Sequence, residues 1–207
     1  MTVKWVRQTA SGEIITEIKS HGGNPSDTIE KILSDHKSSI DSCAVVTGQA
    51  ARAFFNLPYR PQAECLEKAL DHNQLQPDIL LSLGGETFSV FPLREGKVRN
   101  IISSSKCAAG TGEFIVQQFQ RMGLSLEEGL SAAVEGKRVE LATRCSVHCK
   151  LDATHKLNKG QCSPGDIADS LVYDLAKKVS EMVEAAQWLI AQIVIAGGVS
   201  KNELFLE

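Results

Sequence analysis

Apolar and polar residues alternate along the first part of the chain. The segments VKWVRQ (3–8) and IITEIKSH (14–21) both follow a period of two, and Ser11-Gly12-Glu13 separates them. A period of two places every second side chain on one face of a strand, and a short glycine-containing segment between two such runs is typical of a hairpin. The pattern therefore predicts two strands joined by a tight turn.

The next segments follow a helical period and then become apolar. Asn24-Pro25-Ser26 is a typical helix start, and the apolar residues at 29, 32 and 33 fall on one helical face. SCAVVTG (42–48) is a short, nearly apolar run ending in glycine, which predicts a buried parallel strand. A helix is expected over 60–75, and Pro77 is the predicted boundary between a first half, 1–76, and a second half, 77–207.

A similar order of elements recurs after Pro77. The runs DILLSLGG, TFSVFPLREG and KVRNIISSS predict three strands, with turns at Gly84-Gly85 and Glu95-Gly96. Helices are expected over about 110–122, 125–135, 145–159 and 164–190, and a last buried strand over 192–196. Two successive βββαβα-like halves predict an α/β protein whose ligands bind in a cleft beyond the carboxyl ends of the strands.

Composition narrows the classes of function. The chain has 207 residues and a formal net charge of −3, from 22 basic and 25 acidic residues, which argues against binding to nucleic acid or to a membrane surface. Its longest apolar stretch, 185–199, is interrupted by Gln187, Gln192 and two glycines, so no membrane span is expected. The first residues lack the apolar core of a signal peptide. We expect a cytoplasmic location, where structural disulfides are rare, so the six cysteines serve as core residues or ligands.

Three glycine turns follow predicted strands. They are LGGET (83–87), AAGTGE (108–113) and AGGVSKN (196–202). Glycine lets the backbone approach a ligand closely, and backbone N–H groups at such turns or at helix N-termini attract phosphate oxygens. One glycine pair alone is often a plain chain reversal, whereas three turns at strand ends in this order favour a nucleotide site.

These motifs resemble those of a known family. LSLGGETFSVF, KCAAGTGEF, RCSVHCK and IVIAGGVSKN are similar in letters and order to motifs of the activators of 2-hydroxyacyl-CoA dehydratases and benzoyl-CoA reductases. That family belongs to the actin, Hsp70 and sugar-kinase ATPase superfamily. The resemblance implies a ribonuclease-H-like, actin-like ATPase fold of two similar βββαβα halves, the first lacking its opening strand. Residues 1–76 match the family in pattern only.

The resemblance also implies a function and its site residues. Such activators are homodimers that hold one [4Fe–4S] cluster between the subunits, here through Cys107 and Cys145 of each subunit, and that bind ATP or ADP with Mg²⁺. ATP hydrolysis drives transfer of a low-potential electron to a partner acyl-CoA dehydratase or reductase. The residues implied at the nucleotide are Gly84, Gly85, Glu86, Thr87, Gly110, Thr111, Gly112, Gly197, Gly198 and Lys201.

Elementary chemistry agrees with a shared cluster. A cubane cluster needs four thiolates, so two from one chain make half a site and two-fold symmetry supplies the rest. Cys107 precedes a helix expected near Gly110, and Cys145 is expected to open the helix SVHCKLDATHKL. The positive ends of these helix dipoles would stabilise the reduced cluster, each by roughly 0.3–1 kcal/mol.

Other roles for these side chains remain open. Cys43 and Cys65 are most simply small buried apolar residues. A zinc ion could use one helical face carrying Cys145, His148, Cys149 and Asp152, although the spacing matches no known finger. A cysteine nucleophile could use His148 or His155, but nothing marks a base and its orienting group. The remaining histidines, His21, His36 and His72, are expected in solvent.

Two departures from the family bear on catalysis. The chain starts where the family's first acidic, hydroxyl-rich phosphate loop should already have ended, so we expect a truncated piece or one half of a tandem protein. In the second phosphate motif Ser82 and Thr87 replace the usual acids; Glu86 could substitute for them in part, and no catalytic residue is assigned. A hydroxyl is neither a general base nor an anionic Mg²⁺ ligand of comparable strength. We expect weak or absent ATP hydrolysis by this chain alone.

Two further functions compete with the activator. A degenerate ATPase-fold module could act as a binding or scaffold part of a larger tandem activator, as the replaced acids suggest. A sugar or acyl kinase of the same superfamily would leave KCAAGTG unexplained.

Overall fold

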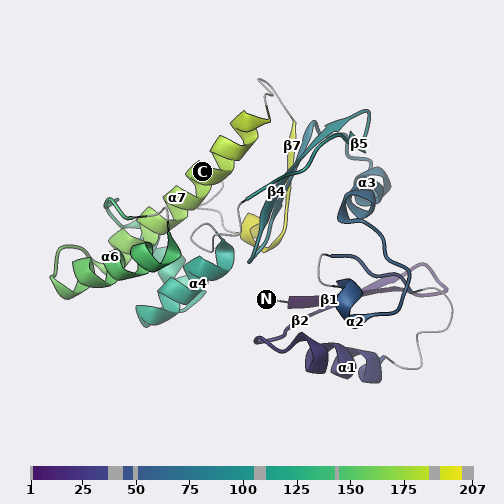
Figure 1. Cartoon of the computed structure of the whole chain (residues 1–207), viewed down its shortest axis with the longest axis horizontal. Helices are drawn as coiled ribbons and strands as arrows, with labels where there is room; N and C mark the ends of the chain where they lie inside the picture. The colour runs from purple at the N-terminus through teal and green to yellow at the C-terminus, as the bar shows by residue number, and fades with distance from the viewer. Residues whose placement is uncertain are drawn as a thin grey trace. The chain divides into compact units, whose positions relative to one another are not determined.

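The structure is a computed structural model that describes residues 2–36, 44–48, 51–104, 111–142, 145–186 and 192–201. The chain forms two compact units, Met1–Ala69 and Leu70–Glu207, which are described separately (Figure 1). The division falls within helix α3, before the boundary predicted at Pro77. The assignment of two similar ribonuclease-H-like halves remains a prediction.

The first unit begins with the predicted hairpin. Strands β1 (Thr2–Gln8) and β2 (Ile14–Ser20) pair antiparallel in a two-stranded sheet, with Thr2 opposite Ser20 and Gln8 opposite Ile14. Helix α1 (Pro25–Asp35) follows, and the side chain of Asn24 caps its start by accepting the N–H of Asp27 at 3.4 Å. The hairpin and the helix start are therefore both confirmed.

Helix α1 is joined to the hairpin through His36. The imidazole stacks on Trp5 with 3.8 Å between ring centroids, and its Nε2 lies 2.7 Å from a carboxylate oxygen of Glu17. The same carboxylate pairs with Lys19, and these two contacts lower the pKa of Glu17, the one to Lys19 more strongly. The expectation that His36 lies in solvent is wrong, because helix α1 ends directly against the hairpin.

The predicted strand over 42–48 is wrong for the residues that the structure describes there. Val46 makes only an isolated parallel bridge with Tyr59, and Val45 is 55% exposed. Cys43 lies outside the described residues. A short apolar run indicates a strand only where a neighbouring strand pairs with it along its length. The unit continues with the short helix α2 (Ala51–Phe54) and with α3 (Gln62–His72), which was expected.

The second unit is built around a mixed sheet. Its described strands are β3 (Ile79–Leu83), β4 (Phe88–Arg94), β5 (Lys97–Val98), β6 (Ile102–Ser103) and β7 (Ile193–Ala196). Their order is β5-β4-β3-β7, with β6 also paired to β4. Strands β3 and β4 pair antiparallel, whereas β7 pairs with β3 in parallel. The third strand expected in this half is divided into two short ones.

Burial in this sheet is uneven. Strand β4 is buried over all but its last residue, and β3 over all but Ser82. Strand β7 is only half-buried, and Ile193 is 43% exposed. The prediction of a buried last strand is wrong because β7 ends the order of described strands and has a neighbour, β3, on one side.

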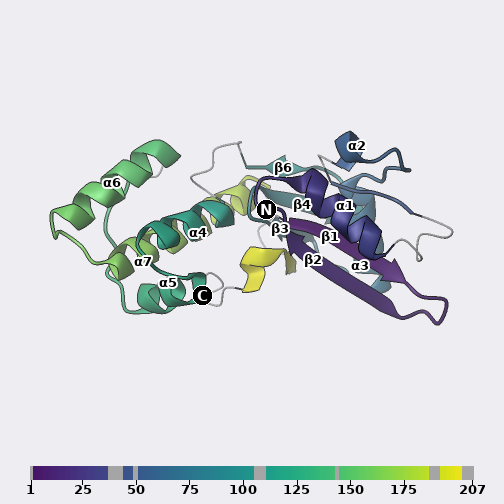
Figure 2. The same cartoon turned by 90° about the horizontal axis from the view of Figure 1, so that it is seen from below.

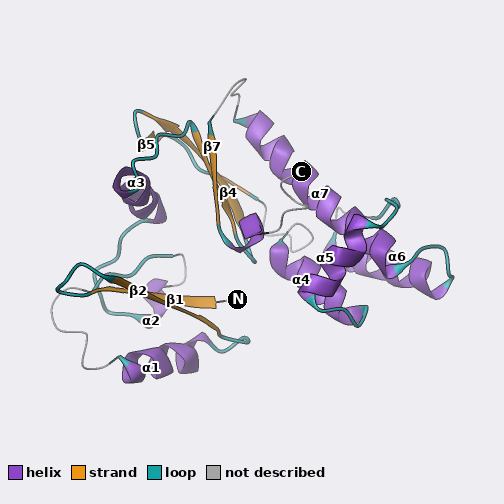
Figure 3. Ribbon diagram, turned by 180° about the vertical axis from the view of Figure 1, so that it is seen from behind, coloured by secondary structure: helices purple, strands orange, loops and turns teal. Residues whose placement is uncertain are grey.

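Four of the described helices accompany this sheet, and their starts agree with the prediction (Figure 3). They are α4 (Gly112–Arg121), α5 (Leu126–Val134), α6 (Ser146–Asn158) and α7 (Pro164–Ala185). Capping boxes fix two of the starts, formed by Ser125 with Glu128 and by Ser163 with Asp166. Apolar side chains from β3, β4 and these helices form one core cluster, which includes Phe88, Val90, Phe119, Ile167, Leu171 and Leu175. No described helix is long and apolar enough to cross a membrane.

Helices α4, α5 and α7 lie side by side (Figure 2) and pack unusually closely. A Cβ atom on Gly136, just after α5, would lie 2.7 Å from the carbonyl carbon of Gly165 in α7. A Cβ on Gly165 would lie 2.6 Å from the carbonyl oxygen of Ala132 in α5. The two helices therefore touch through their backbones. A Cβ atom on Gly129 of α5 would overlap the ring of Phe119 on α4, so these two helices also lie close together.

Candidate functional site

The turns that follow β3 and β7 lie against each other. The parallel pairing of Ser82 with Ala196 brings the carboxyl ends of the two strands together. Gly84 closes the first turn by donating its N–H to the carbonyl oxygen of Thr87 at 3.0 Å. Gly197 begins the second turn with φ +110°, and a Cβ there would collide with the Leu83 carbonyl group, lying 2.8 Å from its carbon. Only glycine fits this position without strain.

The start of α4 completes the arrangement. A Cβ on Gly112 would lie 2.8 Å from Cγ2 of Val199, 3.4 Å from the carbonyl oxygen of Gly84 and 3.6 Å from Cα of Gly85. The N–H of Glu113 donates to the carbonyl oxygen of Gly85 at 2.8 Å. The described parts of the three glycine turns, which are far apart in sequence, therefore meet at one place. Such a meeting of strand ends and a helix N-terminus is a typical anion site of α/β proteins.

The other residues predicted to bind nucleotide differ in their exposure and in their distance along the chain from these turns. Glu86 and Thr87 are exposed on the first turn, and Gly198 starts the short helix η3 (Gly198–Lys201), which ends with exposed Lys201. Thr111 is 5% exposed, and its hydroxyl caps α4 by accepting the N–H of Phe114 at 3.4 Å. Its hydroxyl therefore has a structural task at the helix start. Gly110 and Cys107 lie outside the described residues.

Glu113 is a charged group at this point that sequence reasoning missed. It lies in the first turn of α4, and both its Cβ and its Oε2 would be 3.8 Å from a Cβ on Gly85. Together with Glu86 it brings two carboxylates to the meeting turns. The only sequence signal was its place directly after Gly112, and its proximity to Gly85 depends on the fold.

Cys145 occupies the N-cap position of α6, as predicted from sequence. Its backbone is extended, with φ −137° and ψ 130°, and its side chain is half-buried. The N–H groups of His148 and Val147, at the open end of the helix, lower the pKa of the thiol, although Sγ forms no capping hydrogen bond. A lowered pKa favours the thiolate, which is the form that binds metal.

The cysteine one turn further along α6 has the opposite environment. Cys149 is 1% exposed within the core, and burial raises its pKa to about 11, with Asp174 adding to the effect. His148 is exposed. Within the described ranges no group of three or more His, Cys, Asp or Glu side chains is arranged to hold a metal ion. Cys149 is therefore a core residue, which removes one of the four ligands in the zinc interpretation of this helical face. Cys65, expected in the core, is half-buried.

Comparison with known proteins gives matches along nearly the whole chain. The BadF/BadG/BcrA/BcrD ATPase family matches residues 13–207. The (R)-2-hydroxyglutaryl-CoA dehydratase activating ATPase of Acidaminococcus fermentans is 21% identical over 183 residues, which cover 86% of this chain and 70% of the relative. The 2-hydroxyisocaproyl-CoA dehydratase activator of Clostridioides difficile is 26% identical over 125 residues, which cover 59% of this chain and 46% of the relative.

Two solved structures share the fold. The activator of the 2-hydroxyisocaproyl-CoA dehydratase from Clostridium difficile, with bound ADPNP, has a TM-score of 0.79 and 20% identity, over 99% of this chain and 83% of that one. Component A of the Acidaminococcus fermentans (R)-2-hydroxyglutaryl-CoA dehydratase has a TM-score of 0.80 and 18% identity, over 98% of this chain and 81% of that one. The predicted α/β fold of the actin-like ATPases is confirmed.

Proposed function

Since this chain belongs to the BadF/BadG/BcrA/BcrD ATPase family, we propose that it is an ATP-dependent activator that delivers a low-potential electron to an acyl-CoA dehydratase or reductase. One observation carries the proposal: the glycine turns after β3 and β7 meet the start of α4, with Gly112 packed between Gly84 and Val199. Two relatives bear the names of dehydratase activators, and one solved relative holds ADPNP.

The proposed nucleotide site uses backbone groups to hold phosphate. The N–H groups of Glu113 and Phe114 already have partners, so at the start of α4 the N–H of Gly112 and the positive end of the helix dipole, equivalent to about half a charge, would attract phosphate oxygens. Glu86 and Glu113 repel the same oxygens. Mg²⁺ would offset that repulsion, because carboxylate oxygens and phosphate oxygens are the ligands it prefers. The affinity of these turns for ATP is therefore expected to depend on Mg²⁺ more strongly than the affinity of a phosphate site that lacks acidic residues.

Hydrolysis would require a base near the γ-phosphate. Water attacks the γ-phosphorus, the bond to the bridging oxygen of ADP breaks, and the water proton passes to a base or to phosphate. Ser82 has no charge with which to accept it, so Glu86, exposed on the turn, is the candidate acceptor. Glu86 lies exposed on the turn, and Glu113 lies in the first turn of α4, so neither occupies the place of the usual acids at 82 and 87, which accounts for the weak turnover we expect.

Cys107 and Cys145 are proposed to hold half of a [4Fe–4S] cluster, which supplies one-electron reduction at low potential when bound. The lowered pKa of Cys145 supports a ligand role for that residue. Two thiolates per chain leave a cubane half-ligated, so a second copy of the chain must provide the other two. The N–H groups at the start of α6 favour negative charge beside Cys145, which stabilises a thiolate there.

Anaerobic reconstitution with iron and sulfide tests the cluster. We expect about four irons per dimer, from the ligand count, and loss of iron together with loss of the dimer in Cys145→Ser and in Cys107→Ser. Cys65→Ser, on helix α3 and half-buried, is the matched control and should keep both. Iron-free wild type, or full iron content in Cys145→Ser, would refute the cluster.

Calorimetry with ATP tests the nucleotide site. Wild type should bind ATP with Mg²⁺ at least about ten-fold more tightly than ATP in EDTA, which corresponds to about 1.4 kcal/mol. Glu113→Gln should bind metal-free ATP more tightly than wild type, and thus reduce that ratio, whereas Glu127→Gln, at an exposed position of α5, should not. An unchanged ratio in Glu113→Gln would contradict the role given to this carboxylate.

A second function is favoured by Ser82. In this case the chain does not hydrolyse nucleotide and acts as a binding or scaffold module of a larger activator. Phosphate release separates the two: turnover that saturates with ATP supports the activator, and saturable ATP binding with no phosphate release supports the module. Absence of ATP binding would contradict the activator and would also favour the module.

A further inference from the structure

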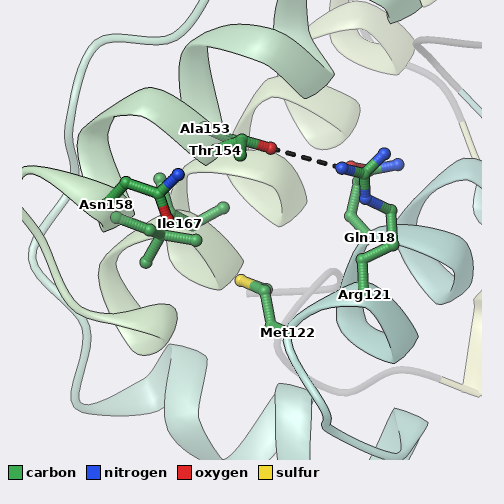
Figure 4. Close-up of a pocket in the computed structure, with 8 residues that line it drawn as sticks. Gln118, Arg121, Met122, Ala153, Thr154, Asn158 and Ile167 are labelled. Atoms are coloured by element: carbon green, nitrogen blue, oxygen red, sulfur yellow. Dashed lines mark hydrogen bonds between the residues drawn. The ribbon is translucent and has the colours of Figure 1, made fainter.

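A small cavity lies between three helices of the second unit, away from the glycine turns. Its volume is about 140 Å³, and it is bounded by the last turns of α4, the second half of α6 and the first turn of α7 (Figure 4). Its polar lining comes from Gln118, Arg121, Thr154 and Asn158, and its apolar lining from Met122, Ala153, Leu157 and Ile167. No acidic side chain is among these residues.

Arg121, an exposed residue, brings a positive charge to the edge of the cavity. Its Nη2 donates to Oγ1 of Thr154 at 3.3 Å, and the Thr154 hydroxyl in turn donates to the carbonyl oxygen of Lys150 at 2.7 Å. A neutral hydroxyl at 3.3 Å is a weak partner for a guanidinium group. Within the part of the chain that the structure describes, no carboxylate pairs with Arg121.

Gln118 brings an amide that opens onto the cavity. The residue is 6% exposed, and among the described residues its side-chain amide has no hydrogen bond. Gln118 and Arg121 are three positions apart on α4 and therefore share one helical face, which lines the cavity. Among the described residues no buried side-chain nitrogen or oxygen lacks a partner, so the Gln118 amide is reached by solvent through the cavity. There it lies beside the guanidinium group of Arg121, and together the two side chains offer hydrogen-bond donors to an anionic ligand.

We propose that this cavity binds a short-chain monocarboxylate. Its carboxylate would accept hydrogen bonds from the planar fork of Arg121 and from the amide of Gln118, since a guanidinium group matches carboxylate geometry. Its aliphatic tail would contact Met122, Leu157 and Ile167. A cavity of about 150 Å³ holds a molecule the size of benzene, so the ligand has about six non-hydrogen atoms, as butyrate does.

A titration of the full chain with butyrate, followed by ¹H–¹⁵N NMR, tests the proposal. We expect saturable shifts at 118–122 and 153–158 with a Kd on the order of millimolar, as befits so small a ligand. Butyramide has the same shape without the charge and should bind at least about ten-fold more weakly. Phosphate, which lacks the apolar tail, should also bind more weakly than butyrate. Absence of saturable shifts, or equal binding of butyrate and butyramide, would overturn the proposal.

Variants distinguish binding of butyrate in this cavity from nonspecific binding to positive charges elsewhere on the protein. Arg121→Gln should weaken butyrate binding at least about ten-fold, because charge-assisted hydrogen bonds to the carboxylate are lost. Arg99→Gln, at an exposed arginine near β5, should leave it unchanged. Ala153→Met should abolish binding by filling the cavity while leaving Arg121 in place. Undiminished binding in both Arg121→Gln and Ala153→Met would show that butyrate binds elsewhere. Neither result depends on ATP or iron.

Discussion

Replacing Gly197 by alanine tests the junction between β7 and β3 directly. Gly197 has φ +110°, a region that residues with a Cβ rarely adopt. An added Cβ would also collide with the Leu83 carbonyl group, lying 2.8 Å from its carbon and 3.1 Å from the Leu83 nitrogen. These neighbours are backbone atoms of a buried strand, so they cannot move aside as a flexible side chain could.

The expected cost follows from these two effects. A left-handed conformation costs a non-glycine residue about 1–2 kcal/mol, and forcing an extra methyl group into a packed site costs about 1–3 kcal/mol. Alanine restricts the unfolded chain, which offsets about 0.5 kcal/mol. Gly197→Ala should therefore lower the free energy of unfolding of the second unit by about 2–4 kcal/mol.

The neighbouring glycine provides the matched control. Gly198 has no heavy atom within 4 Å of its Cβ position and no positive φ, so Gly198→Ala should change stability by less than about 0.5 kcal/mol. Hydrogen exchange measured by mass spectrometry over 79–83 and 193–196 reports the local stability of the two strands. If Gly197→Ala and Gly198→Ala exchange equally slowly, the close approach of Gly197 to Leu83 is wrong.

Three further substitutions probe other parts of the second unit. N–H groups of Ser163 and Lys137 hold the pKa of Asp166 below its ordinary 3.8, so its contribution to stability is present above that pH and is lost as pH falls through the lower folded value. The urea midpoint of wild type should therefore exceed that of Asp166→Asn by more at pH 7 than at pH 3, and an equal difference at both pH values would contradict this. Gly129→Ala should cost about 1–3 kcal/mol in urea unfolding, since its methyl group would overlap the ring of buried Phe119; an unchanged midpoint would contradict the close packing of α5 on α4. Cys149→Ser should cost about 1–3 kcal/mol by burying a hydroxyl in the core, and a neutral result would mean that the hydroxyl finds a hydrogen-bond partner.

Local signals were sufficient to predict several elements. The hairpin depended on alternation around Gly12, and helix α1 on the cap residue Asn24, both of which act within a few residues. Burial and strand pairing depend on segments distant in the sequence, and two predictions of them were wrong. Val46 lacks a pairing strand among the described residues, and β7 lies at the end of the described strand order, although both segments are apolar in sequence.

The candidate site shows the same division. The three glycine motifs were visible as letters, because glycine after a strand is a local signal. Glu113 was not recognised, since its importance arises only where α4 meets the turn at Gly85. The cavity beside Arg121 was also invisible in sequence, because α4 and α6 contribute one wall each.

The backbone contact between α5 and α7 has a mechanical consequence. Helices that meet through Gly136 and Gly165 leave no layer of side chains that could yield between them. A displacement of α5 would thus pass into α7 with little loss. Helix α7 has 22 residues and is about 33 Å long, so a turn of about 5° at one end displaces the other by about 3 Å. Helices α5 and α7 would therefore move as one rigid piece.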